Sequence, residues 1–273
     1  MNLGRVKTYL IIILAIGNVL LAGLFGWRYF PEAAAMRQAN EQLIALLANQ
    51  GIIIRELPNE TVTALVLSRD LAAESAAVAA LLGETQMTDL GGGAFEYLND
   101  VGHALFRSGG RFDIRLFDSD VNWNDDSKVH RDMLDAMGFS GVSKRFIESG
   151  KVEDTDIYAV TIFGQEIEGR PLYNARAEFR FSEKGQLVSV SGLWALGTVQ
   201  AADSILCKSA GAALLLFSEN RDIEVVGVEL GYRLRTQTAT AESARLIPEW
   251  RVICRDTEYY LDGFTGVEVG AEE

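Results

Sequence analysis

The segment from Tyr9 to Trp27 (YLIIILAIGNVLLAGLFGW) constrains this chain more than any other feature, because it carries no charge over its whole length. A helix of these 19 residues rises about 1.5 Å per residue and so spans roughly the 30 Å hydrocarbon core of a bilayer. Asn18 is its only strongly polar side chain. The sequence therefore predicts a transmembrane anchor over residues 9–27.

The charge distribution predicts the orientation of this anchor. The 273-residue chain has a net charge of −13, of which the first 27 residues contribute +2, through Arg5 and Lys7, and the remainder −15. Basic residues flanking a membrane segment favour the cytoplasmic side. We therefore expect a cytoplasmic N-terminus and an extracellular acidic domain in a single-pass protein of the cell membrane. The acidic balance argues against nucleic acid as a partner, because binding it needs a basic surface.

A cleaved signal peptide is the alternative interpretation of the N-terminal segment. The small residues Ala33–Ala35 could form a cleavage site. The apolar stretch is longer than the usual signal-peptide core of about 7–15 residues, which favours a retained anchor.

One face of the predicted anchor differs from the rest. Its residues follow one another at helical spacings of three or four and are mostly small; they are Ile11, Ala15, Asn18, Ala22 and Gly26. Small residues let a second helix approach closely, and a mid-membrane amide gains about 0.6–2 kcal/mol from a polar partner there. We expect this face to be the interface with a transmembrane partner, in a homodimer or a heterodimer. The other interpretation is that its small residues are incidental.

Beyond the anchor, helical and strand-like segments alternate without the order and glycine-rich first turn of a dinucleotide fold. We expect an α+β fold with helices packed on antiparallel sheets. The expected domains are a cytoplasmic N-terminus (1–8), the anchor (9–27), a juxtamembrane helix and linker (28–56), and two extracellular α+β subdomains (57–150 and 151–273). The expected helices are 71–82, 129–137 and 201–217, and the expected strands are 63–67, 95–98, 102–107, 111–117, 156–163, 175–181, 187–193, 224–235, 249–254 and 258–262.

Motifs for catalysis are missing from the sequence. It contains no G-x-S-x-G elbow, no P-loop and no H-E-x-x-H. His103 falls in an expected strand, where we expect a half-buried residue, and His130 in an expected helix, where we expect a surface residue. Neither has a nucleophile nearby in sequence. We therefore predict a protein that is not an enzyme, with no catalytic residue and no cofactor.

An acidic segment and a pair of cysteines raise the questions of a metal site and a disulfide. The acidic segment 118–126 has the D-x-D-x-N start of a calcium loop, but Trp123 replaces the required Gly and Val129 the required Glu, so we predict no EF-hand and no metal. Asp126 or Ser127 is expected to cap the next helix instead. Cys207 and Cys254 are a candidate disulfide if the last helix crosses the late strand, and two buried thiols otherwise.

Four stretches carry a resemblance to a known family, the YycI proteins, and more loosely to their relatives, the YycH proteins. They are Arg5–Thr8 running into the Asn18 helix; Leu46 to Pro58; Gln165 to Tyr173 with Phe181 to Leu187; and Gly231 to Val252 with Tyr259 to Gly266. The last stretch, with P-x-W-R and Y-Y-x-D-x-x-T-G, also looks like a PepSY-type module. Its Trp250 and Thr265–Gly266 are expected in the core and in a hairpin turn. The Ala-rich 71–82 and the Asp/Asn-rich 118–126 depart from the family pattern.

The resemblance implies a function without catalysis. YycI-type proteins are accessory regulators of a cell-wall sensor histidine kinase, so the implied partners are this kinase and a YycH-like companion. The implied contacts are between transmembrane helices and between extracellular domains. The alternative is an extracellular PepSY-like binding or protease-inhibitor module. An envelope hydrolase, which would require His103 or His130 to meet Ser and Asp, is the third hypothesis.

Overall fold

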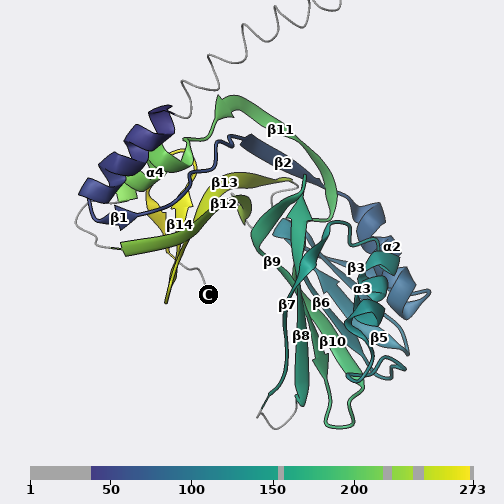
Figure 1. The fold of residues 1–273 in the computed structure, drawn as a ribbon. Helices are drawn as coiled ribbons and strands as arrows, with labels where there is room; N and C mark the ends of the chain where they lie inside the picture. Colours follow the sequence, from purple (N-terminus) through teal and green to yellow (C-terminus); the bar gives the residue numbers. More distant parts are fainter. Residues whose placement is uncertain (1–37, 153–156, 218–222, 236–242, 271–273) are drawn as a thin grey trace, which may run out of the picture.

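The computed structural model describes residues 38–152, 157–217, 223–235 and 243–270. In this part of the chain the strands join into one 15-stranded, strongly curved sheet (Figure 1). None of the helices described there is long and apolar enough to span a bilayer. The predicted anchor (9–27) and its five-residue face lie outside the described residues.

The elements follow one another in the order below. Helical residues 38–49 come first. The helices after them are α2 (Leu71–Leu82), the 3-10 helix η1 (Ser108–Gly110), α3 (Ser127–Ala136) and α4 (Ala210–Phe217). The strands are β1 (Ile52–Ile53), β2 (Thr63–Arg69), β3 (Gln86–Gly91), β4 (Ala94–Leu98), β5 (Gly102–Phe106), β6 (Arg111–Leu116), β7 (Val142–Lys151), β8 (Ala159–Ile167), β9 (Arg170–Phe181), β10 (Leu187–Leu193), β11 (Gly197–Leu206), β12 (Ile223–Arg235), β13 (Ser243–Cys254), β14 (Glu258–Asp262) and β15 (Glu268–Val269).

The sheet is almost entirely antiparallel, as expected for an α+β fold. Its main path is β11-β2-β13-β12-β9-β10-β6-β5-β4-β3, with β8 and β7 attached through β9, and β14 and β15 through β13. The two halves of the path meet in a single parallel pair, Tyr232 on β12 with Leu172 on β9. Above this junction β11 and β2 arch from one half to the other (Figure 1).

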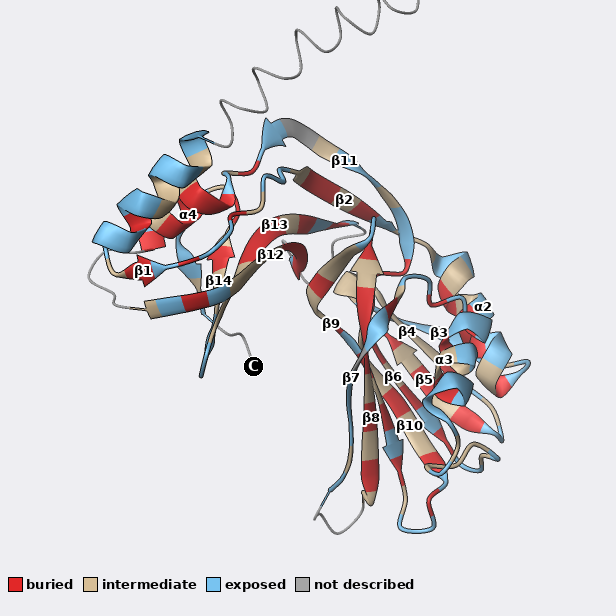
Figure 2. Cartoon of the chain, viewed as in Figure 1, coloured by how far each residue is buried: buried red, intermediate tan, exposed pale blue. Residues whose placement is uncertain are grey.

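Each half buries its own core beneath its own helices. In one half α2 and α3 cover strands that carry Phe106, Phe112 and Phe179 (Figure 2). In the other, residues 38–49 and α4 pack around Trp250. A smaller cluster at the junction includes Tyr232. Helices therefore cover one side of the sheet in each half, and the opposite side of the strands carries polar residues.

Helix α2 has the predicted boundaries, which local chemistry explains. The Asp70 side chain accepts hydrogen bonds from the backbone N–H groups of Ala72 and Ala73, which caps the N-terminus. Gly83, at φ 73°, ends the helix in a conformation that side chains disfavour. The hairpin of β5 and β6 was also predicted, and the Asp126 side chain caps the N-terminus of α3 as expected.

The predicted boundary at residues 150 and 151 does not divide the sheet. Strand β10, assigned to the second subdomain, pairs with β6 of the first. Strand β2, assigned to the first, pairs with β11 and β13. Pairing between strands far apart in sequence decides which half a strand joins, and composition does not reveal it.

The predicted helix over 201–217 is wrong in its first part. Residues up to Leu206 form β11, where Ala201 pairs with Leu65 of β2, and the helix begins only at Ala210. Backbone hydrogen bonds to the neighbouring strand outweigh the helix propensity of Ala201 and Ala202 here. Strands β3 and β7 were missed. All six β3 residues are exposed, so β3 has no hydrophobic alternation to detect.

Residues 38–49 form a helix, as expected for the juxtamembrane segment, and this helix packs into the core. Leu47 is fully buried in the core around Trp250, and Leu43 packs against it. A Cβ on Gly211 of α4 would lie 2.0 Å from Leu43 Cδ2, so this glycine allows the close approach of the two helices. Residues 38–49 are therefore an integral part of the folded domain.

Candidate functional site

The two cysteines do not form the candidate disulfide: both are free thiols in the structure. Cys207 lies in the turn between β11 and α4 and not in a helix, and its Sγ accepts a hydrogen bond of 3.3 Å from the Val62 N–H. Burial raises the pKa of both thiols above their usual value. Both are therefore protonated, unreactive groups at neutral pH.

The two histidines have different environments. His103 is half-buried in β5, as predicted, and its Nε2 lies 3.0 Å from Glu96 Oε1. His130 was expected at the surface, and this is wrong: it is 2% exposed and lies against the rings of Phe179 and Phe181. Its Nε2 is 3.1 Å from the Asn122 carbonyl oxygen. Within the part of the chain that the structure describes, neither histidine is hydrogen-bonded to a Ser, Thr or Cys side chain, as the base of a Ser-His-Asp triad would be.

The acidic segment 118–126 is organised by its own hydrogen bonds. The Asn122 N–H donates to Asp125 Oδ2 at 2.7 Å, and the Trp123 N–H donates to the Gly185 carbonyl at 2.8 Å. Among the described residues, no group of three or more His, Cys, Asp and Glu side chains could hold a metal ion. The segment is a structured loop that attaches α3 to the β9–β10 turn.

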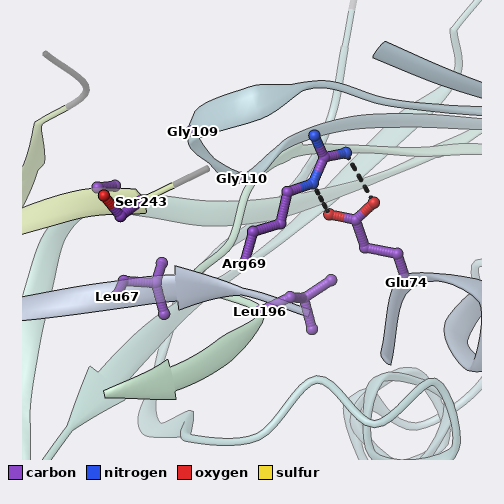
Figure 3. A pocket seen from close by; sticks show the side chains of 8 residues that line it. Leu67, Arg69, Glu74, Gly109, Gly110, Leu196 and Ser243 are labelled. Carbon is purple, nitrogen blue, oxygen red and sulfur yellow. Dashed lines mark hydrogen bonds and ion pairs between the residues drawn. The ribbon is translucent and has the colours of Figure 1, made fainter. Parts of the chain in front are cut away.

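A small pocket lies where β2 meets the N-terminus of α2 (Figure 3). Its polar wall is an ion pair between Arg69 and Glu74, joined by hydrogen bonds of 2.6 and 2.8 Å. Arg69 also donates to the Gly93 carbonyl at 2.5 Å and stacks on Phe95. These contacts satisfy the charges of the pair, which connects β2, α2 and the turn between β3 and β4. We therefore assign the pair a structural role.

The strongest concentration of perturbed ionisable groups lies on the face of β12, β13 and β14 that points away from α4. We call it the Arg–Glu–Tyr cluster. Its residues with shifted pKa values are Tyr173, Glu249, Arg251, Glu258 and Tyr260. Glu229 and Arg233 complete it through their ion pairs with Arg251 and Glu249. Such concentrations mark functional sites more often than other surfaces do.

The inner part of the cluster is a buried ion pair. Arg233 Nε donates to both carboxylate oxygens of Glu249, at 2.9 and 2.8 Å, and the two side chains are 6% and 1% exposed. The Tyr260 ring covers the guanidinium at 5.3 Å, and Tyr173 packs edge-on against Tyr260 at 5.2 Å. Two tyrosines thus separate the pair from water.

The outer part of the cluster remains accessible. Arg251 bonds to both Glu258 and Glu229, and it is 27% exposed. Arg145, which is 81% exposed, reaches Glu229 from β7 at 3.2 Å. The Arg251 hydrogen bond holds the pKa of Glu258 below its usual value, so this carboxylate stays charged over most of the pH range. The cluster presents fixed charges and tyrosines, which suits contact with another polypeptide.

Alkaline pH tests the burial of the tyrosines. Burial raises the pKa of Tyr173 and Tyr260, and it raises that of Tyr232, at the junction, to about 12. The unfolded chain loses these protons near pH 10, before the folded chain does. The stability that the raised pKa of Tyr232 contributes is therefore fully present below pH 10 and is lost as the pH rises through 12.

The expected result is a difference between the natural chain and Tyr232→Phe. Between pH 9 and 11 the natural chain should lose about 1 kcal/mol more of its free energy of unfolding than the variant. Denaturant titrations followed by tryptophan fluorescence measure this. The difference should be constant from pH 7 to 9, and parallel losses from pH 9 to 11 would contradict the assignment.

Sequence reasoning missed the Arg–Glu–Tyr cluster, because its residues come from four strands that meet only in the folded sheet. The P-x-W-R and Y-Y-x-D-x-x-T-G motifs contribute Arg251 and Tyr260 to it. Trp250 is fully buried and donates to the Lys208 carbonyl at 2.9 Å, and Thr265 lies in a turn closed by Asp262, both as predicted. The motif residue Arg251 is on the cluster face, next to buried Trp250.

Comparisons with known proteins assign no family. No protein-family model and no curated protein matches the chain. An uncharacterized protein from Eubacterium rectale is similar in structure, with 11% identity, 81% of this chain and 89% of that chain covered, and a TM-score of 0.47. The Bacillus megaterium YpeB C-terminal domain is similar with 14% identity, coverage of 74% and 96%, and a TM-score of 0.39. Both scores are below 0.5, so neither similarity assigns a function.

Proposed function

We propose that this chain is a membrane-anchored, non-enzymatic regulator that modulates a sensor histidine kinase through transmembrane and extracellular contacts. The observation that carries the proposal is the packing of residues 38–49. They follow the predicted anchor by ten residues in sequence, and Leu47 is fully buried in the core that contains Trp250. A displacement of this helix would therefore move the extracellular sheet as well.

The chemistry of the outer domain also supports contact over catalysis. The arginines and glutamates of the Arg–Glu–Tyr cluster bind one another in ion pairs, and within the described residues the hydrogen bonds of His103 and His130 go to a carboxylate and a backbone carbonyl. If this chain binds one signalling state of the kinase more tightly than the other, it shifts the equilibrium between the two states by that difference in binding free energy. The YycI resemblance implies that the partners of this chain are the kinase and a YycH-like companion.

The test is co-purification of the full chain with the kinase from native membranes. The triple variant Asn18→Leu, Ala22→Leu and Gly26→Leu should reduce recovery of the kinase at least about tenfold, because it removes the polar contact and the space for close helix packing. Signalling output from the kinase should change with it.

A matched control changes the opposite face of the same helix. Ile13→Leu, Leu20→Ile and Leu24→Ile keep the length and hydrophobicity of the segment, and they should leave recovery unchanged. Undiminished co-purification of the Asn18, Ala22 and Gly26 variant, with unchanged signalling, would reject the transmembrane interface.

The second proposal is a PepSY-like binding or protease-inhibitor module. The observation in its favour is that the P-x-W-R and Y-Y-x-D-x-x-T-G stretches form one continuous unit, β13, β14 and the Asp262 turn. Inhibition of envelope proteases by the full chain, without any association with a kinase, would favour this function over the first.

A further inference from the structure

Two strands in the half of the sheet that α2 and α3 cover carry the same charge pattern. Residues 111–115 read RFDIR on β6, and residues 176–180 read RAEFR on β9. In both, the apolar positions between the charges are buried and the charged positions are exposed or partly exposed. Six charged side chains therefore point away from α2 and α3.

The sheet brings these two patterns into register. Strand β10 lies between β6 and β9 and pairs with both, so the charges form three rows across the three strands. We call this surface the arginine ladder. Its rows are Arg115–Ser189–Arg180, Asp113–Ser191–Glu178 and Arg111–Leu193–Arg176. Successive rows are two residues, or roughly 7 Å, apart along the strands.

The ladder has more arginines than its own carboxylates can use. Arg115 is 68% exposed and makes one ion pair, with Asp113 at 3.4 Å. Arg176 and Arg180, 61% and 46% exposed, share Glu178 at 3.4 and 3.0 Å. Each guanidinium has five N–H donors, so most of them remain available. The six charges sum to +2, on a chain whose net charge is −13.

We propose that the arginine ladder binds an extended peptide segment whose side chains on one face alternate acid, base, acid. The outer rows are positive and the middle row is negative, so the complementary ligand carries the opposite order. An extended peptide places alternate side chains roughly 7 Å apart on one face, which matches the spacing of the rows. A uniformly acidic polymer would set its central charges against Asp113 and Glu178.

This inference extends the proposed function, because it specifies the chemistry of an extracellular partner, but it can be tested without the kinase. The experiment uses the detergent-solubilised full chain and fluorescent peptides. The peptide TETKTET should bind at least about fivefold more tightly than the reversed TKTETKT or the uniformly acidic TETETET, from the sum of several exposed charge pairs. Higher salt should weaken the binding.

A change of specificity separates recognition from damage to the fold. Arg111→Glu with Arg176→Glu makes one outer row negative, so the variant should prefer TETKTKT or its reversal TKTKTET over TETKTET. Arg255→Glu is the matched control, because Arg255 is 72% exposed and lies outside the ladder. This control should keep the natural preference.

Three outcomes would overturn the proposal. Equal binding of TETETET and TETKTET would indicate a general surface for polyanions. Equal, weak binding of all peptides would indicate a solvated sheet face. An unchanged preference in the Arg111 and Arg176 variant would place the binding elsewhere. Failure of the kinase co-purification alone would leave the ladder result standing, so the two proposals fail separately.

Discussion

Glu249→Ala is expected to lower the free energy of unfolding by about 3–5 kcal/mol, because it leaves the Arg233 guanidinium buried without a partner. The two side chains are 6% and 1% exposed, and the Tyr260 ring covers the guanidinium, so water cannot replace the carboxylate without a rearrangement. Denaturant unfolding of the full chain in detergent, followed by tryptophan fluorescence, measures the change.

The double variant Arg233→Met with Glu249→Leu should recover most of this loss. Burial raises the pKa of Glu249 even with Arg233 beside it, so the cost of removing the carboxylate from water exceeds the attraction within the pair. An apolar pair of similar volume avoids that cost. A double variant as unstable as Glu249→Ala would show that the stability of the fold depends on the charges of this pair.

An exposed ion pair on the same sheet is the control. Arg255 and Glu224 are 72% and 49% exposed and lie 3.1 Å apart. Glu224→Ala should change the free energy of unfolding by only about 0–1 kcal/mol. The contrast between the two glutamate variants isolates the effect of burial.

The parts of the fold that local chemistry determines could be predicted from the sequence. Helix α2 has both a cap at Asp70 and a stop at Gly83, and its predicted bounds are those of the structure. The β5–β6 hairpin has alternating residues and glycines at its turn. Strand β11 could not be predicted, because its pairing with β2 depends on a partner more than 100 residues away.

The candidate sites show the same division. The Arg–Glu–Tyr cluster draws Tyr173 from β9 and Glu249 from β13, and no local pattern relates them. The burial of His130 depends on Phe179 and Phe181, which α3 contacts only in the folded state. The arginine ladder is different: each strand shows its alternation of charge in the sequence, and only the register between the strands required the structure.

Gly231→Ala is expected to destabilise the junction between the two halves by about 1–3 kcal/mol. A Cβ at this position would lie 2.5 Å from the Pro171 carbonyl oxygen and 2.7 Å from the Tyr173 ring. The nearest obstacle is backbone, which cannot rotate away. The added methyl group must therefore push β9 from β12 beside their one paired position, Tyr232 with Leu172.

Gly227→Ala on the same strand is the matched control. Its nearest neighbour would be Ile253 Cδ1 at 3.8 Å, an ordinary contact, so this variant should equal or slightly exceed the stability of the natural chain. Because β9 carries Tyr173, the Gly231 variant should also expose the Arg233–Glu249 pair, and protection of the Arg233 amide from hydrogen exchange should fall. If both glycine variants had the same stability, the close approach of β9 and β12 would not be what holds the two halves together.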